Sequence, residues 1–342
     1  MLVLGIETSC DDTGVGIVDA DRNIRANVVA SQLAAHRPYG GVVPEIAARA
    51  HLDVIDDVLA QALQESGLSL SDISAVAATT GPGLIGGVMV GSMMGKALSA
   101  VRQLPFISVN HLEAHALTAR LTDNVDFPYL LLLASGGHCQ LLLVRGVGDY
   151  HLLGSTIDDA VGECFDKCAK MLGLGYPGGP LIEQAAKSGN PKAFSLPRPM
   201  LGRAGCEFSF SGLKTSVRTN IAYKTLTPEL VSDMAASLQA AIADSIADRS
   251  RHAFAILKEE GQSVTAFVAA GGVAANQALR ARLTMIAAEN NVTFAAPPPT
   301  LCTDNGVMVA WAGIERFRLG LTDNLDVSAR PRWPLEEARS AS

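Results

Sequence analysis

The sequence lacks the patterns that mark secreted, membrane-spanning or disordered proteins. Its first ten residues, MLVLGIETSC, have neither a basic start nor the long apolar stretch of a secretory signal, and no run of Ser, Gln or charge indicates disorder. The most apolar stretch, Leu84 to Ala100, is interrupted by four glycines and Lys96, and it is shorter than the roughly 20 residues that span a bilayer. We therefore expect a cytoplasmic protein with a buried helix at 84–100 and no membrane partner.

Cysteine is scarce, and its spacing gives no sign of a disulfide framework. The six cysteines include no CxxC pair, and a long cytoplasmic chain has no need of disulfide bonds. Cys164 and Cys168 are four residues apart and could share one helix face as metal ligands. Packing of two thiols inside a helix core explains the same spacing and is the interpretation that we favour.

Basic residues are too few for the whole surface to wrap around nucleic acid. The chain has 27 Lys and Arg against 34 Asp and Glu, a formal net charge of −7, whereas phosphate binding draws on clustered cations. The distribution is uneven, because residues 187–224 contain one acid, Glu207, and seven basic residues. The seven are Lys187, Lys192, Arg198, Arg203, Lys214, Arg218 and Lys224. This segment is either a solvated loop face or a docking patch for a polyanion.

The alternation of apolar and polar residues predicts two copies of a three-stranded meander. The first has strands at 2–6, 14–18 and 24–31 around a polar turn at 7–13, and the second has strands at 129–133, 139–144 and 150–154 around a turn at 134–138. Helices and buried strands follow each copy, among them a helix at 52–66 and a strand at 75–79. With 342 residues, 48% of them hydrophobic, the duplication predicts an α/β fold of two related lobes. Only the last ten or so residues look unfolded.

Two glycine-rich turns follow apolar strands and are suited to binding phosphate. Ser135-Gly136-Gly137-His138 joins two strands of the second meander, where glycines let a ligand approach the backbone. The polar turn at 7–13 matches it, and two facing turns can grip a phosphate chain between lobes. The segment 271–276 follows a strand at 266–270 and opens a helix, so Asn276 could bind a ribose or base. A ligand-free hairpin and a simple helix cap are the alternative interpretations.

Acidic residues alternate with glycines between positions 158 and 180. Asp166 could orient a substrate hydroxyl or amine, and Gly179 could let a ligand approach the backbone. Solvation of a helix and formation of a turn explain these residues equally well.

The segment Asn110-His111-Leu112-Glu113-Ala114-His115 follows a short strand at 106–109 and has the pattern of a capped helix start. Asn110 is the expected N-cap, and Glu113 at the third helical position is expected to complete a capping box. Histidines four residues apart face the same way and suit a divalent metal, although two ordinary, partly buried histidines share this spacing. A distant loop would supply an oxygen ligand. Asp304 is the best candidate, and a helix N-cap is its alternative role.

The order HxExH separates this helix from that of a zinc peptidase. In HExxH the general base directly follows the first histidine. At about 100° per residue, Glu113 lies about 200° round the helix from His111 and points away from the metal. A metal-dependent peptidase would therefore lack its base.

The complete set of motifs closely resembles the TsaD family, also called Gcp or YgjD. The resemblance covers nearly the whole chain. It rests on GIETSCDDT, YGGVVPEIAAR, GPGLIGGVMVG, NHLEAH, LLASGGH, DDAVGECFDK, YPGGP, FSFSGLKT, AGGVAAN, CTDNG and SARPRWPL. Mild departures are Ala114 in place of a common Gly, Asp12 where many relatives have Glu, and Glu183 at a position that is often Asp.

The resemblance implies the actin-like ATPase fold that sugar kinases and heat-shock ATPases share, with two related lobes and a cleft between them. We expect an N-terminal lobe at 1–126, completed by a C-terminal helix at about 306–330, and a C-terminal lobe at 127–305. By resemblance, His111, His115 and Asp304 hold one divalent metal ion per chain, Fe²⁺ or Zn²⁺. The positions that match those holding the adenylate substrate, or ATP, are Leu133, Ala134, Ser135, Gly136, Gly137, Asp166, Gly179 and Asn276.

The family transfers a threonylcarbamoyl group from threonylcarbamoyl-AMP to N6 of the adenosine immediately 3′ of the anticodon, in tRNAs that read codons starting with A. The resemblance therefore implies an acyltransferase with tRNA as partner, acting with the TsaB and TsaE proteins, while TsaC makes the adenylate. No protein nucleophile is required. A metal-dependent glycopeptidase and a non-catalytic ATP-binding protein are the alternatives.

Overall fold

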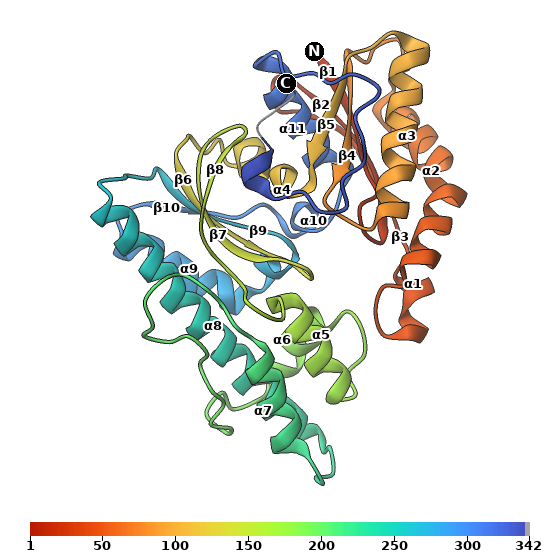
Figure 1. Cartoon of the computed structure of the whole chain (residues 1–342). Coiled ribbons are helices and arrows are strands. Elements are labelled where there is room, and N and C mark those ends of the chain that lie inside the picture. The colour runs from red at the N-terminus through yellow and green to blue at the C-terminus, as the bar shows by residue number, and fades with distance from the viewer. Residues whose placement is uncertain (339–342) are drawn as a thin grey trace. The chain divides into compact units, whose positions relative to one another are not determined.

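The computed structural model describes residues 1–338 and divides into two compact units, each with a five-stranded sheet (Figure 1). Among the described residues, the first unit combines 1–124, 146–150 and 303–338. The second consists of residues 125–145 and 151–302. Both ends of the described chain therefore belong to the first unit.

The sheet of the first unit has the strand order β3-β2-β1-β4-β5. Strands β1, β2 and β3 pair antiparallel as the expected meander, and β4 and β5 add in parallel to β1. The elements of this unit are β1 (Leu2–Glu7), β2 (Asp12–Asp19), β3 (Ile24–Ser31), α1 (Leu33–His36), η1 (Arg37–Tyr39), α2 (Pro44–Ser66), β4 (Ala75–Gly81), α3 (Ile85–Arg102), β5 (Phe106–Asn110), α4 (His111–Thr122), α11 (Gly306–Arg318) and η3 (Leu335–Glu337).

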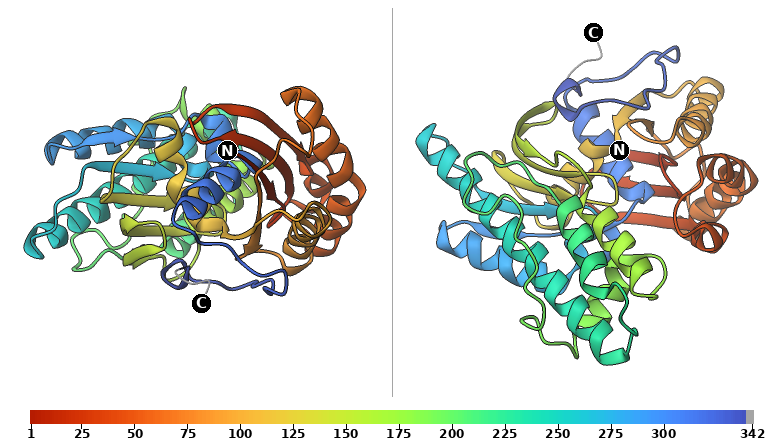
Figure 2. Two further views of the ribbon diagram at one scale, coloured as in Figure 1. Left: turned by 90° about the horizontal axis from the view of Figure 1, so that it is seen from above. Right: turned by 60° about the horizontal axis from the view of Figure 1, so that its bottom comes forward.

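Successive side chains of a strand point to opposite faces, and the two faces of this sheet are covered differently. One face packs apolar side chains such as Ile6 and Ile17 against α2 and α3, which lie side by side (Figures 1 and 2). On the other face, a Cβ atom added to Gly5 or Gly16 would overlap the backbone of α11. Helix α11 therefore lies directly on the strands, and this close approach fixes the turn that precedes it.

The sheet of the second unit repeats the plan, with the order β10-β9-β6-β7-β8. Strands β6 and β7 are antiparallel, and β9 and β10 are parallel to β6. The elements are β6 (Tyr129–Ala134), β7 (Cys139–Gly146), β8 (Asp149–Ser155), α5 (Val161–Met171), α6 (Gly178–Ala186), α7 (Ser211–Ile221), α8 (Pro228–Glu259), β9 (Ala266–Ala270), η2 (Gly272–Ala275), α9 (Gln277–Glu289), β10 (Thr293–Ala295) and α10 (Pro299–Cys302). The long helix α8 runs beside α9, and both contribute to one apolar core with α5 and the sheet.

Two expectations about helices need correction. The helix expected at 52–66 begins eight residues earlier, at Pro44, because proline suits the first turn of a helix. The helix expected at 84–100 is α3, but it is not wholly buried: Gly91 and Gly95 pack against the sheet, whereas Met89 and Met93 are more than half exposed. Among the described helices, α3 included, none combines the length and the apolar composition that a bilayer crossing requires.

The end of the described chain is folded, contrary to expectation. Trp333, Leu335 and Ala338 are buried, and Trp333 accepts a hydrogen bond through its carbonyl from Asn110. Apolar side chains in a segment rich in Pro and Arg explain why the sequence looks unstructured there and yet packs. Residues 339–342, which the same expectation included, lie outside the described residues.

Candidate functional site

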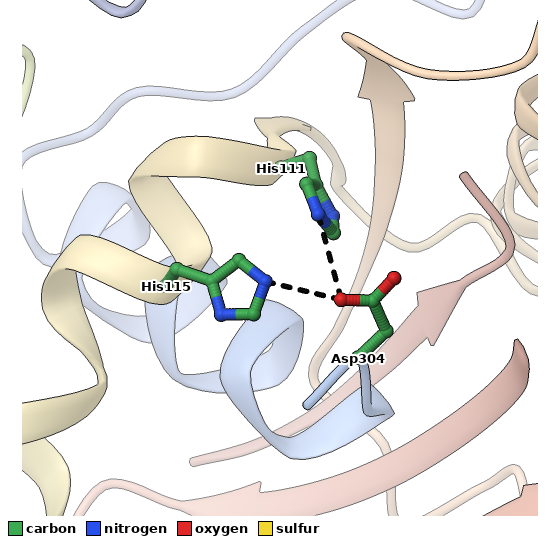
Figure 3. A group of neighbouring side chains, drawn as sticks. All are labelled: His111, His115 and Asp304. Atoms are coloured by element: carbon green, nitrogen blue, oxygen red, sulfur yellow. Dashed lines mark hydrogen bonds and ion pairs between the residues drawn. The ribbon is translucent and has the colours of Figure 1, made fainter. Parts of the chain in front are cut away.

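His111, His115 and Asp304 come together at one point of the first unit (Figure 3). Oδ1 of Asp304 lies 3.1 Å from Nε2 of His115 and 3.6 Å from Nε2 of His111. The two imidazole rings meet edge to face, with centroids 4.7 Å apart. Across residues 1–338, these three side chains are the one group of His, Cys, Asp and Glu close enough to hold a metal ion, with ligand atoms within 4.8 Å of one another.

Helix caps place the three side chains. Asn110 ends β5 and caps α4, since its Oδ1 accepts hydrogen bonds from the backbone N–H groups of Leu112 and Glu113. The cap fixes the first turn of α4, where His111 lies, and His115 follows one turn later. At the start of α11 the cap is Asn305, whose Oδ1 accepts from Met308 N at 2.9 Å. Asp304 is therefore not the N-cap of α11, which was the alternative role considered for it. Its carboxylate faces the two histidines instead.

Glu7, at the end of β1, orients His111 from behind. Its Oε2 accepts a hydrogen bond from Nδ1 of His111 at 3.0 Å and another from the hydroxyl of Thr79 at 2.6 Å, while Oε1 accepts from Ser9 N at 2.6 Å. Glu7 is completely buried. A carboxylate that binds one ring nitrogen of a histidine leaves the other as the ligand, which is the usual arrangement behind a metal-bound histidine. Sequence reasoning placed Glu7 in a phosphate-binding turn and missed this contact.

The electrostatics of the group favour a bound cation. Burial opposes a charge on His111, but the carboxylates of Glu7 and Asp304 outweigh burial and raise the pKa of His111 to about 9. Burial likewise opposes the ionised form of Glu7, yet the partnership with His111 holds the pKa of this carboxyl below its usual value. The two carboxylates therefore draw positive charge to this point, which a proton on His111 or a divalent metal ion can supply.

The residues present fit a divalent metal ion of the iron or zinc type. Imidazole nitrogens and a carboxylate oxygen are its common protein ligands, at about 2 Å from the metal, so ligand atoms around one ion are separated by about 3 to 4 Å. The separations of 3.1 and 3.6 Å lie within this range. Three protein ligands leave a position open for substrate or water.

Glu113 does not complete a capping box, so this expectation was wrong. Its carboxylate instead accepts hydrogen bonds from Gly148 N and the hydroxyl of Tyr150, and it forms an ion pair with Arg316 at 3.0 Å. These partners lie on the side of α4 away from the two histidines. The predicted orientation of Glu113 is thus right, but the side chain binds a buried cation and not the end of its own helix.

The second unit brings its predicted loops together. The turn after β6 is closed by a hydrogen bond from Ser135 N to His138 O, and Ser135 O accepts from Gly162 N at the start of α5. Gly271, which precedes η2, has a φ of +88°, and a Cβ added there would overlap the carbonyl of Ala134. By contrast, apart from adjacent residues of the chain, no atom lies within 4 Å of a Cβ added to Gly136 or Gly137. The turn therefore leaves open space beside these two glycines.

Asp166 and Asn276 already have partners within the second unit. Oδ1 of Asp166 accepts a hydrogen bond of 2.6 Å from Gly178 N and fixes the start of α6, where the next residue, Gly179, again borders open space. Asn276 caps α9 through Leu279 N, and its amide donates to Gln239 Oε1 at 2.8 Å. Asn276 thus precedes the helix rather than lying in its first turn. Glu183 accepts from Gln277 N at 2.7 Å, so it joins α6 to the start of α9.

The cysteines are buried or partly buried free thiols. Cys164 and Cys168 are completely buried in the apolar core of the second unit, and Cys164 donates to Phe210 O. A hydrogen bond between these two thiols, together with burial, raises the pKa of Cys164. Packing therefore accounts for this pair.

The basic segment 187–224 is only partly available to a partner. Arg198 forms an ion pair with Asp244, and Lys214 forms one with Asp159 at 2.6 Å. The remaining five basic residues are exposed on the second unit; they are Lys187, Lys192, Arg203, Arg218 and Lys224. Any docking of a polyanion here would rest on these five.

Comparison with known proteins decides the family. The family described as TsaD, tRNA N6-adenosine threonylcarbamoyltransferase, matches residues 23–311. The chain belongs to the TsaD family. The predictions of an acyltransferase and of a tRNA-modifying function are thereby confirmed.

Relatives in the TsaD family match over almost their whole length. The chain is 59% identical to the tRNA N6-adenosine threonylcarbamoyltransferase of Rhodospirillum rubrum, covering 98% of this chain and 94% of the relative. The enzyme of the same name from Sphingopyxis alaskensis is 58% identical, with 99% and 97% covered. That from Methylobacterium nodulans is 57% identical, with 100% and 99% covered.

Solved structures of low sequence identity share the fold of this TsaD-family chain. HypF of T. kodakarensis is 16% identical with a TM-score of 0.61, covering 93% of this chain and 48% of HypF. Component A of the Acidaminococcus fermentans (R)-2-hydroxyglutaryl-CoA dehydratase is 18% identical with a TM-score of 0.53, covering 91% and 96%. The expected fold class, an α/β actin-like ATPase fold with two related sheets, is thereby confirmed.

Proposed function

We propose that this chain transfers the threonylcarbamoyl group from threonylcarbamoyl-AMP to N6 of the adenosine immediately 3′ of the anticodon, in tRNAs that read codons starting with A. Membership of the TsaD family supports the reaction. One observation carries the catalytic part of the proposal: the possible ligand atoms of His111, His115 and Asp304 lie within 4.8 Å of one another.

The metal centre is the electrophilic part of the site. His111 and His115 would bind one Fe²⁺ or Zn²⁺ through Nε2, and Asp304 through its carboxylate. When bound, the ion supplies a fixed positive charge that stabilises negative charge developing on the carbamoyl oxygen. Glu7, together with Ser9, holds the ring of His111 in the orientation that this requires, because Nδ1 lies 3.0 Å from the Glu7 carboxylate and 3.1 Å from the Ser9 hydroxyl.

The loops of the second unit are proposed to hold the adenylate. The residues are Leu133, Ala134, Ser135, Gly136, Gly137, Asp166, Gly179 and Asn276. The open space beside Gly136, Gly137 and Gly179 supports this role, because a phosphate can approach their backbone N–H groups closely. Asp166 and Asn276 keep the starts of α6 and α9 in place, and an oxygen lone pair on either side chain remains for a ribose hydroxyl.

The reaction needs no covalent intermediate with the protein. The lone pair of adenosine N6 forms a bond to the carbamoyl carbon, the bond from that carbon to the phosphate oxygen breaks, and AMP leaves with the electron pair. N6 gives up one proton, which the departing phosphate can accept. The task of the protein is to align the amine with the carbonyl and to stabilise charge on both oxygens.

We also propose a surface that binds tRNA, two protein partners and the boundaries of the two lobes. The exposed basic residues of segment 187–224 supply a surface for the phosphates of tRNA, and TsaB and TsaE are the expected protein partners in the cytoplasm. We assign residues 1–126 with about 306–330 to the N-terminal lobe and 127–305 to the C-terminal lobe. The division into two compact units supports this assignment, although residues 146–150 and 303–305 group with the first unit.

Two other functions are less well supported. A metal-dependent peptidase needs a carboxylate base beside the metal, and Glu113 is bound to Arg316 on the other side of α4. A non-catalytic ATP-binding protein has no need of the group formed by His111, His115 and Asp304.

Mass spectrometry of tRNA tests the proposal. Unmodified tRNA is incubated with threonylcarbamoyl-AMP, the protein and its partner proteins, and threonylcarbamoyl-adenosine is quantified. We expect modification that depends on the chain and falls after metal chelation, with recovery when Fe²⁺ or Zn²⁺ is restored. Modification that is equal without the chain would refute the transferase, and transfer that survives complete chelation would refute the role of the metal.

A further inference from the structure

The three side chains of the proposed metal centre come from helix α4 and from the turn that precedes helix α11. His111 and His115 lie on α4, whereas Asp304 is in the turn that leads into α11. The distance between a metal ion and each of its ligand atoms varies by only about 0.2 Å around its usual value. A small rotation or slide of α4 against α11 would therefore separate the histidines from the carboxylate. A contact that joins these two helices thus determines the distances among the three proposed ligands.

Glu113 joins them on the face of α4 that is turned away from the metal. It lies between the two histidines in sequence and about 200° round the helix from each. Its carboxylate is completely buried, with Oε2 at 3.0 Å from Nη1 of Arg316, a residue of α11 that is 1% exposed. Oε1 accepts from the hydroxyl of Tyr150 at 2.8 Å and from Gly148 N at 3.1 Å. Three donors from two segments thus hold this carboxylate in one position.

Arg316 is itself held from a second direction. The same Nη1 atom donates to the carbonyl of Ala338 at 3.1 Å. Five residues before Ala338, the carbonyl of Trp333 accepts a hydrogen bond from the side-chain amide of Asn110, the cap of α4. The residues after α11 therefore contact the helix cap directly and contact Glu113 through Arg316.

A buried ion pair is a costly way to join two helices. Removing both charges from water costs more than packing apolar side chains of similar volume, and such pairs are retained in some proteins because they specify one arrangement. A second pair, Arg120 with Glu315, also connects α4 and α11, at 3.1 Å and farther along α4 from the histidines. Of these two pairs, the one formed by Glu113 lies in the part of α4 that carries His111 and His115.

We propose that Glu113 is a positioning residue of the metal centre. Through Arg316 and Tyr150 it fixes the rotation of α4 against α11, and this sets the separation of His111 and His115 from Asp304. The inference rests on the proposed function, because it assigns a task relative to the metal of that site. It gives a role to Glu113, the middle residue of the five from His111 to His115, which neither the transfer reaction nor the helix cap uses.

The test measures metal binding by the full-length chain and not transfer. The double variant Glu113→Gln/Arg316→Met removes both charges, keeps side-chain volume and leaves an amide oxygen for Tyr150 and Gly148. Co²⁺ is the probe, because its visible absorption reports ligand number and geometry. We expect an affinity for Co²⁺ at least about tenfold weaker than that of the unaltered protein, together with an altered absorption spectrum. Tyr150→Phe, which leaves both charges in place, should shift the same spectrum to a smaller extent.

The matched control is Arg120→Met/Glu315→Gln, which removes the other ion pair between the same helices. Its affinity for Co²⁺ should stay within threefold of the unaltered protein, with an unchanged spectrum. A folded Glu113 double variant and a Tyr150→Phe variant that both bind Co²⁺ with unchanged affinity and spectrum would overturn the inference and leave the metal centre standing. If the unaltered protein and a His115→Ala variant bind Co²⁺ equally, the metal centre and the inference fail together.

Discussion

Oε2 of Glu7 and Nδ1 of His111 are 3.0 Å apart, so the histidine presents its other nitrogen, Nε2, toward Asp304. This contact joins the end of β1 to the start of α4. The proposed metal centre would therefore depend on a fourth side chain, Glu7, that would not touch the metal. In the neutral imidazole that a metal ion would require, this hydrogen bond keeps the proton on Nδ1, and together with Ser9, whose Oγ lies 3.1 Å from Nδ1, it restrains rotation of the ring.

Replacing Glu7 should weaken the metal centre without removing a ligand. Glu7→Gln keeps the shape of the side chain but loses the charge that favours binding of a cation, so we expect metal affinity to fall about 10- to 100-fold. Competition with a chelator of known affinity measures the change. Glu45→Gln, at an exposed ion pair on α2, is the control and should bind metal normally. Equal affinities of the two variants would contradict a role for Glu7.

Asp12 should make the metal-free protein less stable as the pH rises. Burial, with added repulsion from Asp304 and Asp11, raises the pKa of this carboxyl from 3.8 to about 7, and its Oδ1 has no hydrogen-bond partner in residues 1–338. Between these pH values the folded chain retains a proton that the unfolded chain has released. The free energy of unfolding should therefore decrease by up to about 1.4 kcal/mol per pH unit from about pH 4 to pH 7.

Denaturant unfolding at several pH values checks this prediction. Asp12→Asn should remove the slope and should gain stability relative to the unaltered protein above pH 7. The exposed Asp21 provides the control, because Asp21→Asn should leave the slope in place. A slope that persists in Asp12→Asn would show that another group is responsible.

The last described residues should contribute to stability. Leu335 is completely buried, whereas Leu325 in the same C-terminal segment is 43% exposed. Leu335→Ala leaves a cavity and should lower the free energy of unfolding by about 2 to 5 kcal/mol. Leu325→Ala should change it by less than about 1 kcal/mol. Thermal unfolding compares them, and equal melting temperatures would speak against packing of this segment.

The exposed basic residues should determine how salt affects tRNA binding. Lys192→Glu/Arg218→Glu should weaken binding and reduce the slope of log affinity against log salt concentration by about 1 for each lost phosphate contact. Arg198 and Lys214 are unsuitable targets, since each is paired with an acid. Arg102→Glu/Lys258→Glu is the control. If both double variants change the slope equally, the net charge of the protein determines tRNA binding, and the basic residues of segment 187–224 form no specific binding surface.

Local spacing in the sequence predicts the parts of this site that are local. The interval from His111 to His115 is one helical turn, and the polar residue before an apolar helix predicts the cap at Asn110. The meanders are predicted well for the same reason, because alternation over a few residues defines a strand. The cap at Asn305 adjoins Asp304 and competes with it for the same role, so position in sequence alone does not decide between them.

Contacts between distant residues account for what the sequence does not predict. Helical spacing predicts which way Glu113 points, but its partner Arg316 is 203 residues away in the sequence. The nearby residues Asn110 to Glu113 also match the pattern of a capping box, which is the local alternative. Glu7 is 104 residues from His111, in a turn whose polar residues equally suit a phosphate. Similarly, nothing near Leu335 indicates the buried surface that it covers.

The return of the chain to the first unit has a consequence for biosynthesis. Asp304 follows His115 by 189 residues, and α11, which lies on the glycines of β1 and β2, comes after it. At about 5 to 20 residues per second, a ribosome needs roughly 10 to 40 seconds to pass from one ligand to the other. During that interval the emerging chain has two histidines and an uncovered sheet but no complete centre. Loading of the proposed centre with metal would therefore be a late event, which follows release of the finished polypeptide or closely precedes it.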